Sequence, residues 1–412
     1  MGKSKIVGGS TFAINGPVRS YPVFGTRKTD SGDFVAIAQE TTKPVILGAA
    51  YDNQTGLPRY LKACQRPDEN MVFIDEKYNY SSYGSTYGIQ LREWGFSGEA
   101  AEILYDIDVD SFGGDPTYDI DMMPNGYTVI AAYGSSPSRY LSTYYAYLYV
   151  YNKGELVAKM TLKDYGEGAG ARQIGICAVD ERHILVTRGE GYSVCSLEND
   201  VLTVVQASDN IGLQSTMCHT LELADPDRVL YVGRNSHVLS ISEDYAVTAN
   251  TATACNIFLY PSVQKIADNL WTVSGDRIIA RMSMNADNTL NMEYMTQELP
   301  STVHDTVYVP ELDMLHAYMS SHYCILASPA EEYRPVRLAG HSYNIQNFRD
   351  IAICKTSDRK IHQALVSSRA NEPYYSWHAA TTYGIEQSDE NILGVVLQSR
   401  HPGEMAKVAC VR

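Results

Sequence analysis

Residues 181–197, ERHILVTRGEGYSVCSL, contain two short apolar segments joined by a tight turn of the Gly, Asn or Ser type that carries a basic residue. The same unit recurs at residues 227–242 (DRVLYVGRNSHVLSIS), 268–284 (DNLWTVSGDRIIARMSM) and 311–328 (ELDMLHAYMSSHYCILAS). Apolar and polar residues alternate within these segments, which is typical of strands with one face in the core. Each unit therefore predicts a β-hairpin.

Further copies begin near residues 32, 69, 125, 349 and 390, so the unit recurs about every 40 to 56 residues. By this period the chain resembles β-propellers, although it lacks the motifs of the WD40, kelch and sialidase classes. A lone hairpin sheet cannot bury both apolar faces, whereas blades stacked around an axis cover one another. We therefore expect an all-β propeller of about seven or eight blades, closed by pairing of N- and C-terminal strands.

The whole chain, residues 1–412, is predicted to be one propeller domain, because no linker-like stretch divides it. Residues 1–30 form an arm or closing strand in this prediction, and residues 390–412 supply strands of the closing blade. Closure predicts that residues 407–411 pair with a segment inside the first 50 residues. Loops are expected near 80–86, 96–124 and 134–143, with one short helix near 97–105.

The formal charge of −15 argues against a nucleic-acid partner, because a phosphate backbone requires a positive footprint. The sequence shows no signal-peptide pattern and no apolar run near the roughly 20 residues that span a bilayer. Synthesis in the cytoplasm without membrane insertion is therefore expected. The eight cysteines form no CxxC pair and are expected to be mostly buried free thiols.

Charge is unevenly distributed along the chain. Residues 93–121 hold nine acidic side chains and no Lys or Arg, whereas the first 28 residues hold five basic side chains and no acid. These segments are either solvated surface or complementary patches that dock neighbouring copies or partners. The opening KIVGGSTFAI (residues 5–14) is also similar to structural and tail proteins of tailed bacteriophages, and this resemblance implies a virion location.

Asp106, Asp108 and Asp110 (DIDVD) resemble the first half of a calcium loop, but Ser111 stands where such a loop requires glycine. Ile107 and Val109 alternate with the acids, as in a strand with one solvated face. The sequence leaves both interpretations open: a solvated strand, or a Ca²⁺ site outside the EF-hand class. No other cofactor is predicted. His316 and His322 lie in the two arms of one hairpin and are expected to pack together rather than to bind metal.

Tyrosine is over-represented, with 31 Tyr against 8 Phe and 3 Trp. Tyrosine combines a large apolar ring with a hydrogen-bonding tip, which suits contact surfaces, especially beside Ser and Gly. The alternative is packing between blades. Three clusters form the predicted binding residues: Tyr78, Tyr80, Tyr83 and Tyr87; Tyr133 and Tyr140; and Tyr374, Tyr375, Trp377 and His378.

The favoured function is a non-catalytic structural or recognition protein that presents tyrosine-rich loops to other protein subunits, in a homo- or hetero-assembly, or to a glycan. Within this class we favour a phage virion component of the tail, baseplate or capsid periphery. One alternative is a carbohydrate-active glycosidase or lyase with carboxylates in the central channel, which leave no local signature in a sequence. A cytoplasmic interaction scaffold is the other alternative. No catalytic residue is predicted.

Overall fold

The computed structural model describes part of the chain, and it describes side chains only between residues 62 and 333, with gaps. The described residues are 3–7, 10–14, 18–22, 34–36, 39–40, 49–52, 61–67, 70–81, 84–97, 100–113, 116–135, 144–162, 173–213, 219–257, 261–296, 299–310, 313–319, 322–331, 333–340, 348–355, 360–369, 372–386, 392–396 and 405–410. They form β-strands and connecting turns, and no α-helix occurs among them.

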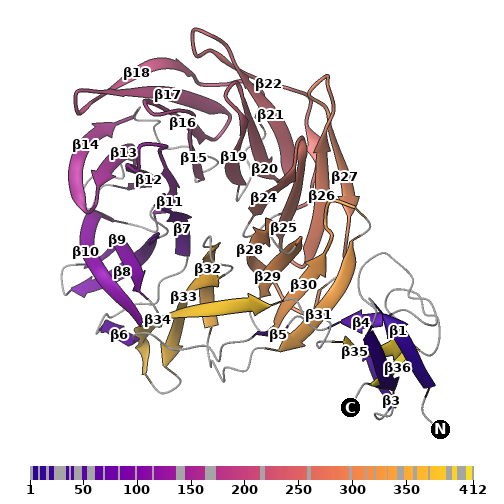
Figure 1. Ribbon diagram of the computed structural model, residues 1–412. Helices are drawn as coiled ribbons and strands as arrows, with labels where there is room; N and C mark the ends of the chain where they lie inside the picture. Colours follow the sequence, from indigo (N-terminus) through magenta and orange to yellow (C-terminus); the bar gives the residue numbers. More distant parts are fainter. Residues whose placement is uncertain are drawn as a thin grey trace.

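Seven antiparallel sheets follow one another along the chain and form the blades of a ring (Figure 1). The first three blades comprise β7 (Leu61–Gln65), β8 (Met71–Ser81), β9 (Gly84–Ser97) and β10 (Ala100–Phe112); β11 (Thr117–Met122), β12 (Thr128–Ser135), β13 (Tyr144–Asn152) and β14 (Glu155–Thr161); and β15 (Ile174–Ala178), β16 (His183–Arg188), β17 (Gly191–Glu198) and β18 (Val201–Ser208).

The next three blades comprise β19 (His219–Asp225), β20 (Arg228–Gly233), β21 (Asn235–Ile241), β22 (Val247–Ala249) and the two-residue β23 (Thr253–Ala254); β24 (Ser262–Ala267), β25 (Leu270–Gly275), β26 (Ile278–Met284) and β27 (Leu290–Tyr294); and β28 (Val303–Val309), β29 (Met314–Met319), β30 (His322–Ala327) and β31 (Arg334–Gly340). The seventh comprises β32 (Phe348–Lys355), β33 (Lys360–Arg369) and β34 (Glu372–Glu386), with β5 (Gln39–Glu40) and β6 (Ala49–Asp52) paired to β34.

The first strands of the blades lie side by side around the axis, and the series closes where β32 contacts β7. The seventh blade joins both ends of the chain, because Ala49 lies opposite Ala379 and Tyr51 opposite Trp377. The predicted propeller, its seven blades and its closure by N- and C-terminal strands are thus confirmed.

Five hydrophobic clusters occupy the spaces between neighbouring blades in the part of the chain with described side chains. Cluster members come from blades one and two, two and three, three and four, four and five, and five and six. Val186 and Leu148, for example, share a cluster although they belong to different blades. Full burial of such a side chain contributes about 1.5–3 kcal/mol, so each blade is stabilised mainly by its neighbours.

Tight turns join many of these strands. Lys153 and Gly154 connect β13 to β14 with φ of 47° and 86°, and Asn199 and Asp200 connect β17 to β18 with φ of 49° and 63°. Two consecutive residues with positive φ are typical of type I′ hairpin turns, whose twist matches that of the flanking strands.

The terminal strands form two further sheets. Residues 405–410 (β36) pair with β3 (Val18–Pro22), which confirms the predicted contact between the C-terminal tail and the first 50 residues. However, β36 then pairs with β35 (Ile392–Val396) and β35 with β4 (Phe34–Ala36), in a sheet beside the ring rather than in a blade. β1 (Lys3–Val7) and β2 (Ser10–Ile14) form a separate hairpin. Hairpin periodicity alone did not distinguish these strands from those of a blade.

Four local expectations need correction. The helix near 97–105 and most of the loop at 96–124 are strands β10 and β11, because β10 pairs with β9 along its length. Residues 80–86 are largely a continuation of the β8–β9 hairpin. His316 lies opposite Ile325 rather than His322. The predicted loop at 134–143 begins in β12, and its residues 136–143 lie outside the described part of the chain.

Candidate functional site

The innermost strands carry polar residues that connect one blade to the next. Thr117, Asp119 and Asp121 alternate along β11 and so share one face of this strand. The Asp119 carboxylate accepts a hydrogen bond from the Ile176 amide at 3.2 Å, and the Asp121 carboxylate accepts one from the Ala178 amide at 2.7 Å. Both donors lie on β15, so the two aspartates join blade two to blade three.

A similar polar connection joins blades five and six. The Ser262 hydroxyl donates to the Asp305 carboxylate at 2.8 Å and lies 2.9 Å from the Thr306 hydroxyl. The Tyr308 amide donates to the Gln264 side-chain oxygen at 3.4 Å. Buried backbone amides without hydrogen-bond partners are costly. Polar side chains on the inner strands therefore accept hydrogen bonds from amides of the neighbouring blade.

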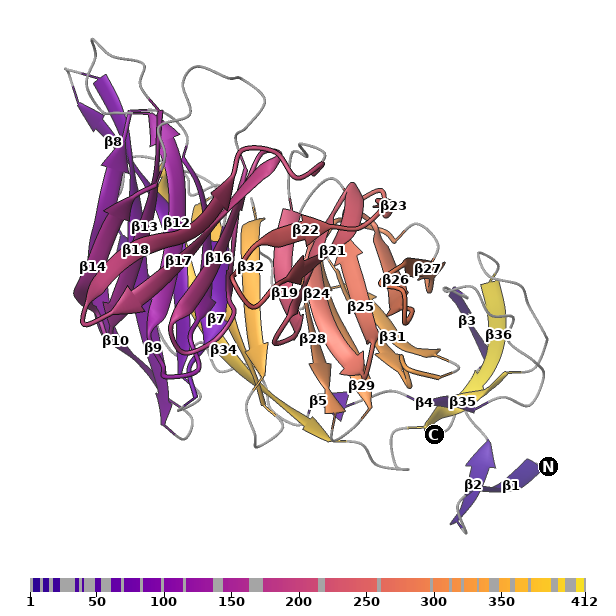
Figure 2. The same cartoon turned by 90° about the horizontal axis from the view of Figure 1, so that it is seen from above.

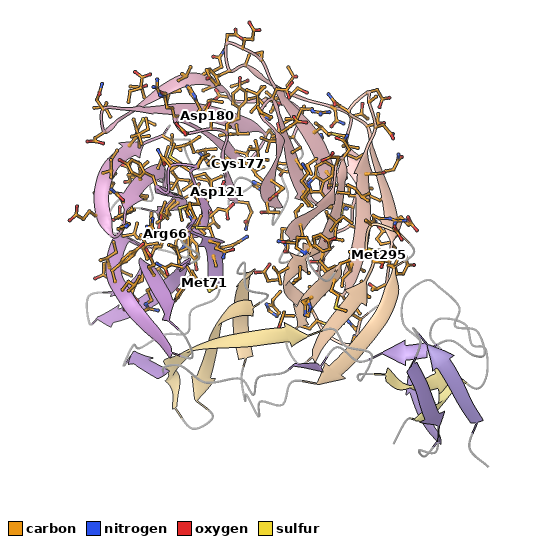
Figure 3. The ribbon with its side chains drawn as sticks, viewed as in Figure 1. Arg66, Met71, Asp121, Cys177, Asp180 and Met295 are labelled. Carbon is orange, nitrogen blue, oxygen red and sulfur yellow. The ribbon has the colours of Figure 1, made fainter. Side chains whose placement is uncertain are left out.

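Carboxyl groups on the inner strands β11 and β19, which lie on either side of β15, influence one another's ionisation. Burial and the charge of Asp119 raise the pKa of Asp121 to about 6, although amide hydrogen bonds oppose this shift. Burial and the charge of Asp121 raise the pKa of Glu222, on β19, to about 8. Figure 3 shows Asp121 and Cys177 on the inner side of the ring. At neutral pH the Asp121 carboxyl is therefore mostly ionised and the Glu222 carboxyl mostly protonated.

Two lysines lie near these acids. Lys62 Nζ is 3.8 Å from an Asp119 oxygen, with the Asp119 side chain 8% exposed. Lys265 opposes the rise in the pKa of Glu222. We refer to Lys62, Asp119, Asp121, Glu222 and Lys265 as the axial cluster. Among the described residues, no group of three or more His, Cys, Asp or Glu side chains is placed to hold a metal ion.

Sequence reasoning missed His219, which packs beside the axial cluster. Its Nε2 lies 3.0 Å from the Thr187 hydroxyl, and its ring stacks on Tyr231 at 4.5 Å. A Cβ on Gly175 would approach Nε2 to 2.6 Å, so only glycine fits there. Burial lowers the pKa of His219 to about 3, with a smaller effect from Lys62. His219 is thus a neutral packing residue at neutral pH.

The three aspartates of the suggested calcium site lie on β10, and each has a separate protein partner. Asp106 forms an ion pair with Arg92 at 3.1 Å, and Asp108 accepts a hydrogen bond from the Gln90 side-chain Nε2 at 3.2 Å. Asp110 contacts Lys159 at 2.7 Å and accepts from the Tyr149 hydroxyl at 2.6 Å. Burial raises the pKa of Asp110, but these hydrogen bonds hold it below its ordinary value. Calcium binding stays a prediction from the sequence.

The candidate tyrosines occupy different environments. Tyr133 is buried between blades two and three, where it stacks on Tyr144 at 5.6 Å and lies 4.3 Å from the Arg188 guanidinium. Tyr374, Tyr375, Trp377 and His378 belong to β34, in a strand rather than a loop, with Trp377 opposite Ser367 and Tyr51. Tyr83 and Tyr140 lie outside the described residues.

The first tyrosine cluster lies on an extended ribbon. Among the described residues, β7 pairs with β8 only as far as Asp75, whereas β8 continues to Ser81 beside β9. Tyr78 lies directly opposite Tyr87, and Tyr80 is two residues further along β8. Because directly paired residues and alternate residues share a face of an antiparallel sheet, the register places Tyr78, Tyr80 and Tyr87 on one face. We call this the tyrosine face.

No family model matches the chain, and no curated protein matches it. Three similar solved structures have low sequence identity to it. A chain in the crystal structure of the mitotic checkpoint complex has a TM-score of 0.50 and 9% identity, and the match covers 85% of this chain and 97% of that one.

An α-L-arabinanase of Penicillium chrysogenum gives a TM-score of 0.48 with 11% identity over 82% of this chain and 98% of that one. The α-L-arabinofuranosidase Arb93A of Fusarium graminearum gives 0.47 with 11% identity over 84% and 98%. At such identities the likeness concerns the fold alone. None of the described residues forms a helix long and apolar enough to cross a membrane.

Proposed function

We propose that this chain is a non-catalytic recognition propeller that binds a protein subunit or a glycan through the tyrosine face of the β8–β9 ribbon. The observation that carries this proposal is the register that groups Tyr78, Tyr80 and Tyr87 beyond the last residue paired with β7. Tyrosine rings supply contact area at a low entropic cost, and nearby Ser and Gly residues adapt to a partner.

The hydrogen bonds of the inner carboxylates favour a non-catalytic protein over an enzyme. Asp119 and Asp121 already accept hydrogen bonds from amides of β15, so they serve to connect blades. The loose similarity of residues 5–14 to phage tail proteins supports a virion as the setting in which such a recognition protein acts. Co-purification with phage particles tests that setting.

Replacing Tyr78 and Tyr80 together by Ala tests the tyrosine face. We expect binding on a glycan array, or capture of protein subunits from the source particles, to fall by about tenfold or more, as for aromatic hot spots. Tyr294→Ala is the matched control, because Tyr294 is 39% exposed on the outer strand of blade five. Equal binding by the double variant and wild type would refute the proposal.

A second candidate function is supported by the ionisation of the axial cluster. A carboxyl with a pKa of about 8 beside one with a pKa of about 6 resembles the acid and carboxylate roles of glycosidases. Glu222→Gln should then abolish release of reducing sugar from a polysaccharide panel without lowering the melting temperature. No release by the wild-type protein would remove this alternative.

A further inference from the structure

The outer strand of blade three has an unusual composition. β18 has the sequence VLTVVQAS, with neither a charged residue nor proline. Val201, Val204 and Val205 are 58%, 48% and 43% exposed. Its backbone pairs with β17 on one side, and none of the described strands pairs with its other edge. An edge of this kind can accept another strand.

The outer strands of the other blades carry the features that normally prevent such pairing. Acidic residues occur in β10 and β27, Glu155 and Lys159 in β14, and two arginines with a proline in β31. β22 and β6 have only three and four residues. Natural sheets use charges, proline and short edges to block unwanted pairing. β18 is therefore the one long outer strand among the described blades that lacks this protection.

A second open edge occurs at the N-terminus. Among the described strands, β1 (KSKIV) and β2 (STFAI) pair only with each other. A two-stranded hairpin is marginally stable alone, so a further strand beside it would stabilise it. The hairpin also lies in the basic segment of the chain, which holds Lys3 and Lys5.

Charge makes the two edges complementary. β18 is preceded by Glu198 and Asp200 and followed by Asp209, and all three are exposed. The basic strand β1 would meet acidic groups at either end of β18. Opposite charges at the ends of an otherwise uncharged pair of strands speed association and favour this partner over others.

The hairpin and β18 of one molecule lie on opposite sides of the ring, as Figures 1 and 2 both show. One chain therefore does not join its own two edges. We propose that β1 of a second copy of this chain adds as a strand to the free edge of β18. The contact is head to tail, so repetition produces a closed ring of subunits or an open filament. This inference is independent of the tyrosine face.

Two complementary variants test this contact in the full chain. Val204→Lys places a charge on the β18 edge, and Lys3→Glu with Lys5→Glu reverses the charge of β1. Each variant should be monomeric by light scattering at a concentration where the wild type assembles. A mixture of the two should form a 1:1 dimer, because one molecule keeps an intact hairpin and the other an intact edge.

The control is Tyr294→Lys, a similar change on the outer strand of blade five, which should leave assembly intact. High salt should weaken wild-type assembly by about tenfold, because exposed charges are screened. The proposal is overturned if the wild type is monomeric at every concentration, if Val204→Lys still assembles, or if the mixture stays monomeric.

Discussion

Arg66 forms a buried ion pair within blade one and a hydrogen bond to blade two, and its removal should strongly destabilise the protein (Figure 3). Its Nε lies 2.7 Å from a Glu93 oxygen, with both side chains 3% exposed. Its Nη1 donates to the Gly126 carbonyl of blade two at 2.6 Å. Arg66→Met keeps the aliphatic bulk but leaves the Glu93 carboxylate buried without its cation.

Loss of one partner of a buried pair costs about 3–5 kcal/mol, because the remaining charge is neither paired nor hydrated. Asn70 still donates to the other Glu93 oxygen at 2.9 Å, which favours the lower half of that range. The Gly126 carbonyl also loses its donor, which adds about 1 kcal/mol or more. We therefore expect a total loss of about 4 kcal/mol in the free energy of unfolding.

Urea unfolding followed by tryptophan fluorescence measures this loss. Asp268→Asn is the control, because the Lys265–Asp268 pair at 3.8 Å is solvent-exposed and should contribute little. The double variant Arg66→Met with Glu93→Leu should recover much of the loss, because it leaves no unpaired buried charge at this position. A loss below about 1 kcal/mol for Arg66→Met would refute the reasoning, because it would equal that of a surface pair.

Three further predictions concern the axis and the contact between the first two blades. Glu222 has a higher pKa folded than unfolded, so its contribution to stability is lost as pH rises from about 4.5 to about 8; Glu222→Gln should therefore stabilise the protein more at pH 9 than at pH 5, and equal effects in chemical denaturation would contradict the raised pKa. Gly175→Ala should destabilise the protein by about 1–3 kcal/mol through overpacking against His219. An unchanged melting temperature would show that the His219 imidazole moves aside freely. Asp110→Asn should cost about 1 kcal/mol by weakening the contacts to Tyr149 and Lys159, and a gain in stability by calorimetry would contradict this account.

The hairpin units at 181–197, 227–242 and 268–284 were predictable from the sequence, because alternation and turn residues are local signals. Each lies across the second and third strands of a blade. The inner and outer strands have weaker patterns. β10 was expected to be mostly a loop with a short helix, although Asp106, Asp108 and Asp110 alternate with Ile107 and Val109 as in a strand, and β9 pairs with it along its length.

The axial cluster was not predictable from the sequence. Asp119, Glu222 and Lys265 belong to three different blades, and only the ring brings them together. Asp110 was assigned to a possible calcium loop, whereas it accepts a hydrogen bond from Tyr149 of blade two, which no local pattern reveals. The pairing of Tyr78 with Tyr87 was not predictable either, because it depends on the register of the β8–β9 hairpin.

Closure of the ring by β6 and β34 is the central claim, and a designed disulfide tests it most directly. Ala49 and Ala379 are directly opposite in register, and such Cα atoms are about 4.5–5.5 Å apart, within disulfide range. We predict that Ala49→Cys with Ala379→Cys forms an intramolecular disulfide on mild oxidation, mapped by mass spectrometry. Ala49→Cys with Ala380→Cys, one residue out of register, should not. A monomer without the first cross-link, or with only the second, would contradict the closed seven-bladed ring.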